Sequence, residues 1–454
     1  MGTAEPAYKD PWLWGAIGVA FLLRMLPMLI WGENGCMRDE CAYVGLATGI
    51  VDGQGLQPAQ RWLWAPLYPY LLAGWSTVAN IASFKRVQVV LSLGNLALLY
   101  AIGHRVEGRR VARIAAWVFA LHPTLIYFSG RLWTEAVFLF LLTAAIALIP
   151  WVRDGRPWRG AALGATLAAC ALTRGMGVYL APMFLVALVW PTNDWPDGLR
   201  RYGKHAAITL AATLLAIAPY SYSASTTHGG FIISDVTLGE VAYNGNNDFP
   251  APTWDLGNGL VGTETLQRVL SSGRERCDSS LSVVDAKDCE VERAKEWVLA
   301  HPAEFARRIP LRWAQLLNPN SFLTRHIRIG LWRGLPHWVR DLIALSVIFT
   351  SVLLTFGGTL GLIGRGKGAL SMVSVGLALY VFAVVGCLFG VSRFRLPLVP
   401  LWIVWTAVFL AAPRATLQTI RGSKWRLTLA IAAIIGLVPL VSWFLLAGFP
   451  AWYR

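Results

Sequence analysis

The chain has 454 residues, of which 56% are hydrophobic and only 14% are charged, and its mean hydropathy is +0.51. This composition excludes an ordinary soluble domain and indicates a protein that crosses a membrane many times. The formal net charge of +15 does not indicate nucleic-acid binding, because the basic residues lie in short loops between apolar segments and not in one patch.

Apolar segments in chain order predict an all-α polytopic membrane protein. The first segment is too long for the core of a signal peptide and lacks a small-residue cleavage site, so we expect it to stay in the protein as a helix. We predict about eleven transmembrane helices, at 11–31, 87–104, 111–129, 134–151, 159–173, 176–191, 206–222, 338–363, 368–390, 396–412 and 427–448.

The segment 63–83 is long enough to cross but contains two prolines and several polar residues. If it does not cross, the basic loops all fall on one side of the membrane, as the positive-inside rule favours. We therefore expect an interfacial segment, a cytoplasmic N-terminus, and extracytoplasmic loops at 32–86 and 223–337. In a bacterium this is an inner-membrane protein whose reactive groups face the periplasm.

This topology predicts three parts. Residues 1–222 form a transmembrane module with its first loop at 32–86, residues 223–337 form a small mixed loop domain, and residues 338–454 form the C-terminal helices. The first half of the loop domain is rich in turn residues, whereas 291–300 and 302–317 have helical spacing.

Asp39 and Glu40 follow the first span directly and precede a helical pattern at 43–51. One interpretation is that they only cap this helix at its N-terminus. The other is that one carboxylate accepts a proton from a hydroxyl group during glycosyl transfer, a reaction that needs a general base beside the acceptor oxygen.

Glu135 stands at the outer end of an otherwise apolar span. A carboxylate at this depth needs a partner, and Arg131 lies one helical turn away. A local ion pair is one interpretation. The alternative is a site of two carboxylates, Glu135 and Asp39, with or without a cation.

Several arginines are expected on the same face near the membrane surface. Guanidinium groups bind phosphate oxygens in a fork, so these residues are candidates for binding a polyprenyl phosphate. Each could instead reach toward lipid headgroups. The candidates are Arg38, Arg61, Arg131, Arg174, Arg393 and Arg395.

Other polar residues are weaker candidates for contacts with sugar or acceptor. Packing beside Pro123 would also explain the histidine among them, and turn chemistry would explain the asparagines. These candidates are Tyr43, Tyr68, His122, Asn244, Asn246 and Asn247.

The six cysteines divide by environment. Cys277 and Cys289 lie in the long polar loop and either form a disulfide or remain free thiols. Cys36 and Cys41 flank the acidic pair, and we expect no bridge between them.

A series of short motifs resembles the GT-C glycosyltransferases, in the branch of protein O-mannosyltransferases and lipid A aminoarabinose transferases. In order, the matching pieces are 38–43, 53–56, 65–68, 120–123, 134–135, 172–174, 300–302 and 395–400. One position departs from the pattern: the lipid A transferases carry a lysine before the proline of the first loop, and here Ala65 precedes Pro66.

The resemblance implies a GT-C fold with juxtamembrane helices in the first loop, a sugar donor on polyprenyl phosphate, and inverting transfer on the extracytoplasmic face. It also implies that Asp39 is the base and that Glu135 helps to form the site. Oligosaccharyltransferases carry a large soluble domain with no counterpart in these residues, so we do not expect transfer of a whole glycan to protein.

The motifs leave the sugar undetermined and allow a glycan, lipid or protein acceptor. We expect a monomer surrounded by membrane lipids, no nucleic-acid partner and no obligatory cofactor, with room for Mg²⁺ or Mn²⁺. The alternative function is a transporter or flippase of lipid-linked sugars, which would favour inverted repeats and ionisable groups near the midplane.

Overall fold

The computed structural model describes residues 7–32, 36–37, 39–57, 63–190, 195–247, 277–278, 280–319, 322–328, 330–332 and 334–452. Within these residues every regular element is a helix, which agrees with the all-α expectation. The N-terminal half contains η1 (Ala7–Lys9), α1 (Pro11–Trp31), α2 (Asp39–Val51), α3 (Leu67–Ser76), η2 (Ile81–Ser83), α4 (Phe84–Glu107), α5 (Arg109–Leu121), α6 (Pro123–Ser129), α7 (Glu135–Arg153), η3 (Pro157–Arg159), α8 (Gly160–Thr173), η4 (Gly175–Tyr179), α9 (Leu180–Val189) and α10 (Trp195–His228).

The C-terminal half continues this pattern of long apolar helices joined by shorter ones. It contains α11 (Leu238–Gly245), α13 (Val283–Ala300), α14 (Pro302–Leu317), α15 (Phe322–Arg328), α16 (His337–Arg365), α17 (Gly368–Cys387), η5 (Ser392–Leu398), α18 (Val399–Ala411), α19 (Pro413–Arg421) and α20 (Lys424–Trp452).

In the described part of the chain, eight helical stretches are long and apolar enough to cross a membrane, and the bent pair α5 and α6 would make a ninth span. These nine correspond to nine of the predicted spans. The two others, 159–173 and 176–191, correspond to α8 with 14 residues and to η4 with α9, a shorter apolar stretch at Gly175–Val189. The total of eleven therefore remains a prediction.

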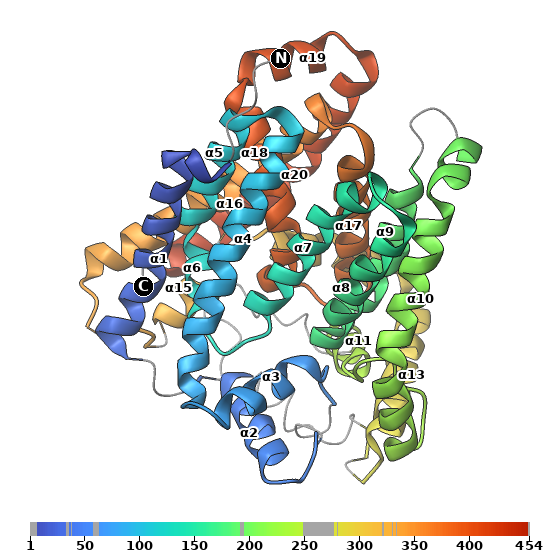
Figure 1. Cartoon of the computed structure of the whole chain (residues 1–454). Coiled ribbons are helices and arrows are strands. Elements are labelled where there is room, and N and C mark those ends of the chain that lie inside the picture. Colours follow the sequence, from blue (N-terminus) through green and yellow to red (C-terminus); the bar gives the residue numbers. More distant parts are fainter. Residues whose placement is uncertain are drawn as a thin grey trace.

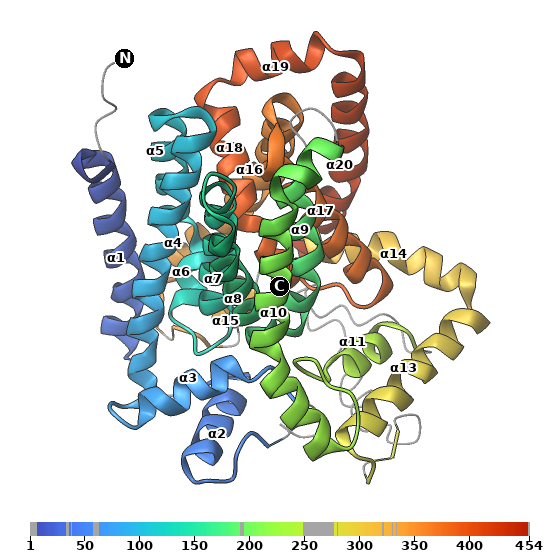
Figure 2. The ribbon, with the colours of Figure 1, turned by 45° about the vertical axis from the view of Figure 1, so that its right-hand side comes forward.

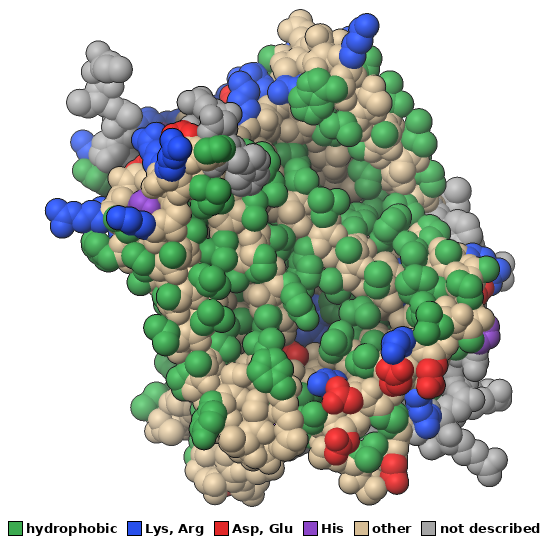
Figure 3. Space-filling model, turned by 90° about the vertical axis from the view of Figure 1, so that its right-hand side faces the viewer, with side chains coloured by type: hydrophobic (Ala, Val, Ile, Leu, Met, Phe, Trp, Pro, Cys, Tyr) green, Lys and Arg blue, Asp and Glu red, His purple; other side chains and the backbone are tan. Residues whose placement is uncertain are grey.

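Several of the helices that connect the spans lie at two opposite ends of the molecule (Figures 1 and 2). The first-loop helices α2 and α3 lie at the end that also carries α11 and α13, and α19 lies at the other end. We call the first of these the site end. In Figure 3 a band of mostly hydrophobic side chains separates charged groups near the top from charged groups at the lower right, as expected for a bilayer-spanning surface.

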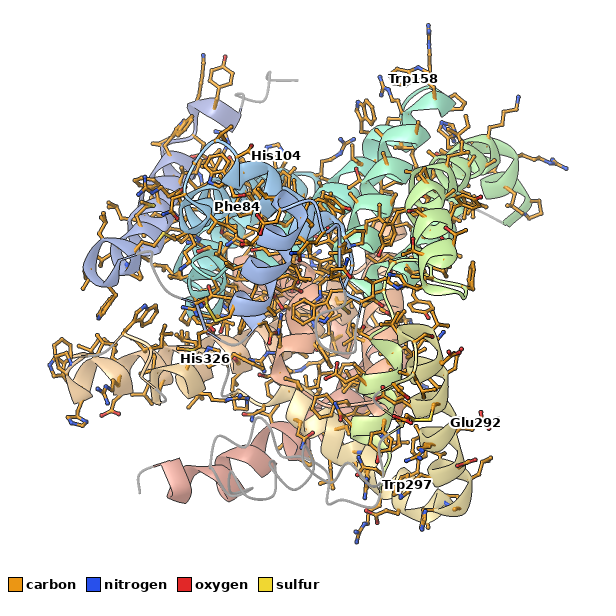
Figure 4. All side chains as sticks on the ribbon, turned by 90° about the horizontal axis from the view of Figure 1, so that it is seen from below. Phe84, His104, Trp158, Glu292, Trp297 and His326 are labelled. Atoms are coloured by element: carbon orange, nitrogen blue, oxygen red, sulfur yellow. A yellow bond between two sulfur atoms is a disulfide. The ribbon has the colours of Figure 1, made fainter. Side chains whose placement is uncertain are left out.

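The segment 63–83 is not a spanning helix in the structure. Its main helix, α3, has 10 residues, which is about 15 Å of helix and only half of a typical hydrocarbon thickness. The ring of Tyr68 in α3 lies 5.0 Å from that of Tyr43 in α2 and 6.1 Å from that of Phe84 at the start of α4. Figure 4 views the molecule from the site end, with Phe84 labelled. The aromatic contacts fix both short helices against the bundle.

The bent span has a clear local cause. Pro123 begins α6 and disfavours a helical conformation at His122, so α5 ends there and α6 leaves at 62°. Nδ1 of His122 accepts a hydrogen bond from Leu125 N at 3.4 Å and caps the new helix. His122 is therefore a buried capping residue, and this contact accounts for its position without a sugar.

The break exposes backbone carbonyls at the end of α5, and a buried arginine of α1 satisfies them. Arg24 donates hydrogen bonds to the carbonyl oxygens of Phe119 at 3.3 Å and Ala120 at 3.2 Å, and to Ser92 Oγ in α4 at 2.8 Å. In hydrocarbon these groups have no water to bond, so the contacts join three helices.

Small residues allow the closest helix contacts. On α16, a Cβ at Gly361 would overlap the Trp405 carbonyl oxygen of α18, and a Cβ at Gly357 would lie 3.1 Å from Thr406. On α8, Gly164 packs in the same way against α10 at Thr209. Glycine at such positions lets membrane helices approach closely.

Replacing Gly361 with alanine should therefore lower the thermal unfolding midpoint of the purified protein by several degrees. The added methyl group forces α16 and α18 apart, at a cost of about 1–3 kcal/mol. The matched control is Gly436→Ala in α20, where a Cβ would meet nothing within 4 Å. Equal midpoints for the two variants would contradict the packing argument.

Candidate functional site

The acidic pair begins α2 and lies inside a disulfide-closed turn. Cys36 and Cys41 are bonded, with their Cα atoms 5.0 Å apart, so the expectation that they stay unbridged is wrong. The first turn of α2 returns the chain far enough to bring the two Cα atoms within disulfide range. The closed turn presents Asp39 and Glu40 in different directions, with different consequences for each.

Glu40 is fully buried and holds the first loop in place. Its carboxylate accepts hydrogen bonds from Leu132 N at 2.7 Å and Met37 N at 3.0 Å, forms an ion pair with Arg131, and lies 4.0 Å from Lys85 Nζ. This carboxylate joins α2 to the loop between α6 and α7 and to α4. Through these contacts Glu40 anchors the first loop, and it does not line the pocket described below.

The local ion pair between Arg131 and Glu135 that the sequence spacing allowed is not formed. Its guanidinium binds Glu40, 91 residues away in the chain. Sequence spacing alone could not identify this partner, because Glu40 reaches Arg131 only when the first loop packs against the loop after α6. Arg131 does not line the pocket described below.

Glu135, at the start of α7, lies between two guanidinium groups. Arg174, which follows α8, and Arg393 in η5 both bind its Oε1 atom. Arg393 also donates a hydrogen bond from Nη1 to Asp39 Oδ2 at 2.6 Å. The Arg393 guanidinium lies 4.4 Å from the centre of the Trp133 ring, a favourable cation–π distance. Four parts of the chain thus meet in one network of charges.

The network contains two carboxylates and two guanidinium groups, so its formal charge is zero. Its members differ in access to solvent: 41% of the Asp39 side chain is exposed, compared with 1% for Glu135. The Arg174 and Arg393 side chains are 17% and 13% exposed. Asp39 is therefore the carboxylate of this network that another molecule can reach.

A pocket of about 590 Å³ opens beside this network. Asp39, Arg174 and Arg393 line it, together with aromatic, hydroxyl and aliphatic side chains. Burial raises the pKa of the Tyr43 phenol, so this residue remains a neutral hydrogen-bond donor at the pocket wall. The other lining residues are Trp64, Ala65, Thr134, Thr173, Gly175, Met176, Val178, Tyr179, Phe231, Ile233, Ser234, Asp235, Thr237, Leu238, Glu240, Val241, Lys287, Tyr380, Val381, Val384, Val385, Leu388 and Phe394.

Arg395, two residues after Arg393, points elsewhere. It is buried and donates hydrogen bonds to the carbonyl of Asn318 and to Ser351 Oγ, the latter at 2.9 Å. It therefore joins η5 to α16 and to the end of α14 and does not reach the pocket. Arg38 and Arg61 lie outside the described residues.

The asparagine cluster and Tyr68 are also held by internal contacts. Asn246 is buried, donates to the Cys387 carbonyl at 3.0 Å and accepts from Arg312 at 2.9 Å, and Asn247 donates to the Tyr243 carbonyl at 2.7 Å. Tyr68 is buried behind Tyr43 and donates to Gln88 at 2.9 Å. None of these residues, nor Asn244, lines the pocket.

The structure adds pocket residues that the sequence patterns did not indicate. Asp235, Glu240 and Lys287 line the pocket from the segment before α11, from α11 and from α13, and Tyr380 reaches it from α17. A lone acid in the apolar run 231–236 was the available signal for Asp235. Cys277 and Cys289 are joined by a disulfide at the start of α13.

The different roles of the two adjacent acids can be tested through stability. Glu40→Gln should lower the thermal unfolding midpoint strongly, because it leaves Arg131 without its countercharge; breaking a buried pair costs about 3–5 kcal/mol. Asp39→Asn is the matched control and should change the midpoint little, since its carboxylate is partly solvated. Indistinguishable midpoints would show that Glu40 is no anchor.

Comparison with known proteins gives a fold. No protein-family model and no curated protein matches the chain. Among solved structures, the apo form of the Archaeoglobus fulgidus oligosaccharyltransferase is 15% identical, with a TM-score of 0.51, over 98% of this chain and 57% of that one. The chain thus spans little more than half of that protein.

Two further structures overlap less closely. The same oligosaccharyltransferase in complex with Zn and sulfate is 16% identical, with a TM-score of 0.45, over 94% of this chain and 52% of that one. ArnT from Cupriavidus metallidurans bound to undecaprenyl phosphate is 14% identical, with a TM-score of 0.41, over 90% and 78% of the two chains. The fold assignment rests on the apo oligosaccharyltransferase: the chain is a polytopic membrane protein with the GT-C fold.

Proposed function

We propose that the protein is a membrane glycosyltransferase that moves a sugar from a polyprenyl-phosphate donor to a hydroxyl group of an acceptor. The observation that carries the proposal is the meeting of a solvent-accessible carboxylate, Asp39, with two guanidinium groups, Arg174 and Arg393, on the wall of one pocket in a GT-C fold. The site end is then the extracytoplasmic face.

The pocket suits both ends of such a donor. Arg174 and Arg393 supply forked donors for phosphate oxygens. A largely aliphatic wall from α17 and η4 offers an apolar surface for the first isoprene units: Val178, Val381, Val384, Val385 and Leu388. The aromatic rings of Tyr43 and Trp64, 4.4 Å apart, form a wall near Asp39 against which a sugar can pack.

In the proposed reaction the acceptor hydroxyl oxygen attacks the anomeric carbon from the face opposite the phosphate. A new carbon–oxygen bond forms, the bond from that carbon to the phosphate oxygen breaks, and its electron pair leaves with the polyprenyl phosphate. The hydroxyl proton goes to the carboxylate of Asp39, which acts as the general base. Attack from the opposite face inverts the anomeric centre.

Arg393, which binds both Asp39 and Glu135, can stabilise the charge that develops on the leaving phosphate in this step. Before transfer its positive charge is shared between Asp39 and Glu135. When Asp39 takes up the proton it loses its charge, while the leaving phosphate changes from a diester with one negative charge to a monoester with about −1.5 to −2. Arg393 can then give its freed hydrogen bonds to the leaving group without a change of partners at Glu135.

In this proposal Glu135 is a positioning residue. It is almost completely buried, and its carboxylate is engaged by Arg174 and Arg393. Since both acids of the network already bind a guanidinium, the arginines supply the positive charge that a cation would otherwise provide. Within the described residues no cluster of three or more His, Cys, Asp or Glu side chains offers a metal site, and the proposed reaction has no step through a metal.

The base is tested with Asp39→Asn in lipid nanodiscs, with a panel of radiolabelled polyprenyl-phosphate sugars and crude envelope acceptors. We expect a decrease in turnover of about 10²–10⁴-fold with unchanged binding of the lipid phosphate. The matched control is Asp52→Asn, an exposed acid just after α2, which should transfer label as the wild type does. Wild-type rates for Asp39→Asn would exclude this base, and no transfer by the wild type from any donor would favour a transporter.

Phosphate binding is tested with Arg393→Gln and undecaprenyl phosphate as the probe. Loss of charge-assisted hydrogen bonds worth about 1.5–3 kcal/mol should weaken binding roughly 10- to 100-fold. Arg156→Gln, an exposed arginine in the loop after α7, removes the same charge far along the chain from the pocket and should bind as the wild type does. Equal affinity for both variants would remove Arg393 from the donor site.

A further inference from the structure

Arg174 lies on a turn that other parts of the chain hold in place. Arg174 itself is in an extended conformation between α8 and η4, with φ −152° and ψ 134°. Its own N–H bonds the Cys170 carbonyl at 3.1 Å, and its carbonyl accepts from Gly177 N at 2.7 Å. These bonds fix the direction in which the Arg174 side chain leaves the backbone.

The next residue, Gly175, is bound by a carboxylate from the loop domain. Asp235 Oδ2 accepts a hydrogen bond from Gly175 N at 2.9 Å. A Cβ at position 175 would overlap this same carboxylate, so only glycine permits the contact. Asp235 also accepts hydrogen bonds from the backbone and side chain of Thr237, while burial raises the pKa of its carboxyl group.

The segment that carries Asp235 is itself fixed. Val236 N donates to the Leu63 carbonyl at 3.0 Å, which joins the segment to the first loop. Ile232 N donates to Ser225 Oγ in α10 at 2.9 Å. The Asp235 carboxylate is therefore held from both sides and can act as a fixed reference point for the turn.

A second contact holds the turn from the other side. Tyr380 Oη in α17 donates to the Met176 carbonyl at 3.0 Å. Three consecutive residues, 174–176, are thus each bound to a different part of the chain. The Arg174 side chain binds Glu135. The backbone N–H of Gly175 and the backbone carbonyl of Met176 bind the side chains of Asp235 and Tyr380, respectively.

We propose that Asp235 is a positioning residue for donor binding: its hydrogen bond to Gly175 N holds the Arg174 turn so that the guanidinium faces the donor phosphate. The inference rests on the proposed function. An arginine side chain has about 2 kcal/mol of rotamer entropy to lose, and a fixed backbone reduces the number of orientations that binding must select. Asp235 bonds a backbone amide, which leaves the Arg174 charge for Glu135 and the phosphate.

Whether removal of the Asp235 carboxylate weakens or tightens phosphate binding distinguishes a positioning role from a purely electrostatic one. Removing a negative charge beside a phosphate site should tighten phosphate binding if charge alone matters. If Asp235 positions Arg174, the same change should weaken binding. The proposal therefore predicts a result opposite in direction to the one that the charge of Asp235 would give.

The experiment measures binding of undecaprenyl phosphate to the full-length protein in nanodiscs. Asp235→Ala should weaken binding about tenfold when binding is measured well below its thermal midpoint, which falls because Gly175 N and Thr237 lose their acceptor. Asp235→Asn should stay within about threefold, because its amide oxygen can still accept from Gly175 N. Gly175→Ala, which displaces the carboxylate, should behave as Asp235→Ala does. Glu296→Ala, an exposed acid on α13, is the control for charge and should bind as the wild type does.

A double variant tests whether Asp235 acts through Arg174. In an Arg174→Gln background, Asp235→Ala should cause no further loss, since two residues that act as a unit are not additive. Full additivity, or unchanged or tighter binding by Asp235→Ala alone, would overturn the inference. If the wild type does not bind undecaprenyl phosphate, the proposed function fails; if Arg174→Gln weakens binding and Asp235→Ala does not, only this inference fails.

Discussion

The carboxylate of Glu135 accepts hydrogen bonds from two guanidinium groups, and the position of the site depends on this arrangement. Arg174 follows α8, Arg393 lies in η5, and Asp39 belongs to the first loop. Glu135 binds both arginines, and Arg393 in turn binds Asp39, so one buried acid links all three. Buried charges at membrane depth are costly unless they are paired. The pairing therefore fixes three distant segments relative to one another and leaves one carboxylate, Asp39, partly open to the pocket.

Adjacent acids in the sequence have acquired opposite environments. Glu40 is enclosed by Arg131, Lys85 and backbone N–H groups, whereas Asp39 faces solvent and Arg393. A helix start can achieve this, because successive side chains on a helix point about 100° apart. The disulfide between Cys36 and Cys41 closes the same turn, so the orientation of both acids is set before any substrate arrives.

Much of the architecture could be predicted from hydropathy and charge. The length of the apolar segments predicted the long helices. The positive-inside rule predicted that 63–83 does not cross, and in the structure its helix α3 is indeed too short to do so. Residue type and order also singled out Asp39, Glu135, Arg174 and Arg393, which the structure brings to one network. The patterns failed where pairing is non-local: Arg131 binds Glu40 and not Glu135, and Arg395 binds backbone carbonyls. They also missed Asp235, whose role depends on a contact with a glycine 60 residues earlier.

The buried arginine of α1 has a consequence for biogenesis. Arg24 finds its partners on α4 and α5, about 70 to 100 residues later in the chain. During synthesis the first helix must enter the bilayer with an unpaired cation, at an insertion cost of about 2.5–3.5 kcal/mol near the membrane centre. Arg24 can form its interhelical hydrogen bonds only after the helices that carry Ser92, Phe119 and Ala120 have been synthesised and inserted. The helices α1, α4 and α5 must therefore assemble together, and translation must pass the end of α5 before Arg24 in the first helix has all of these partners.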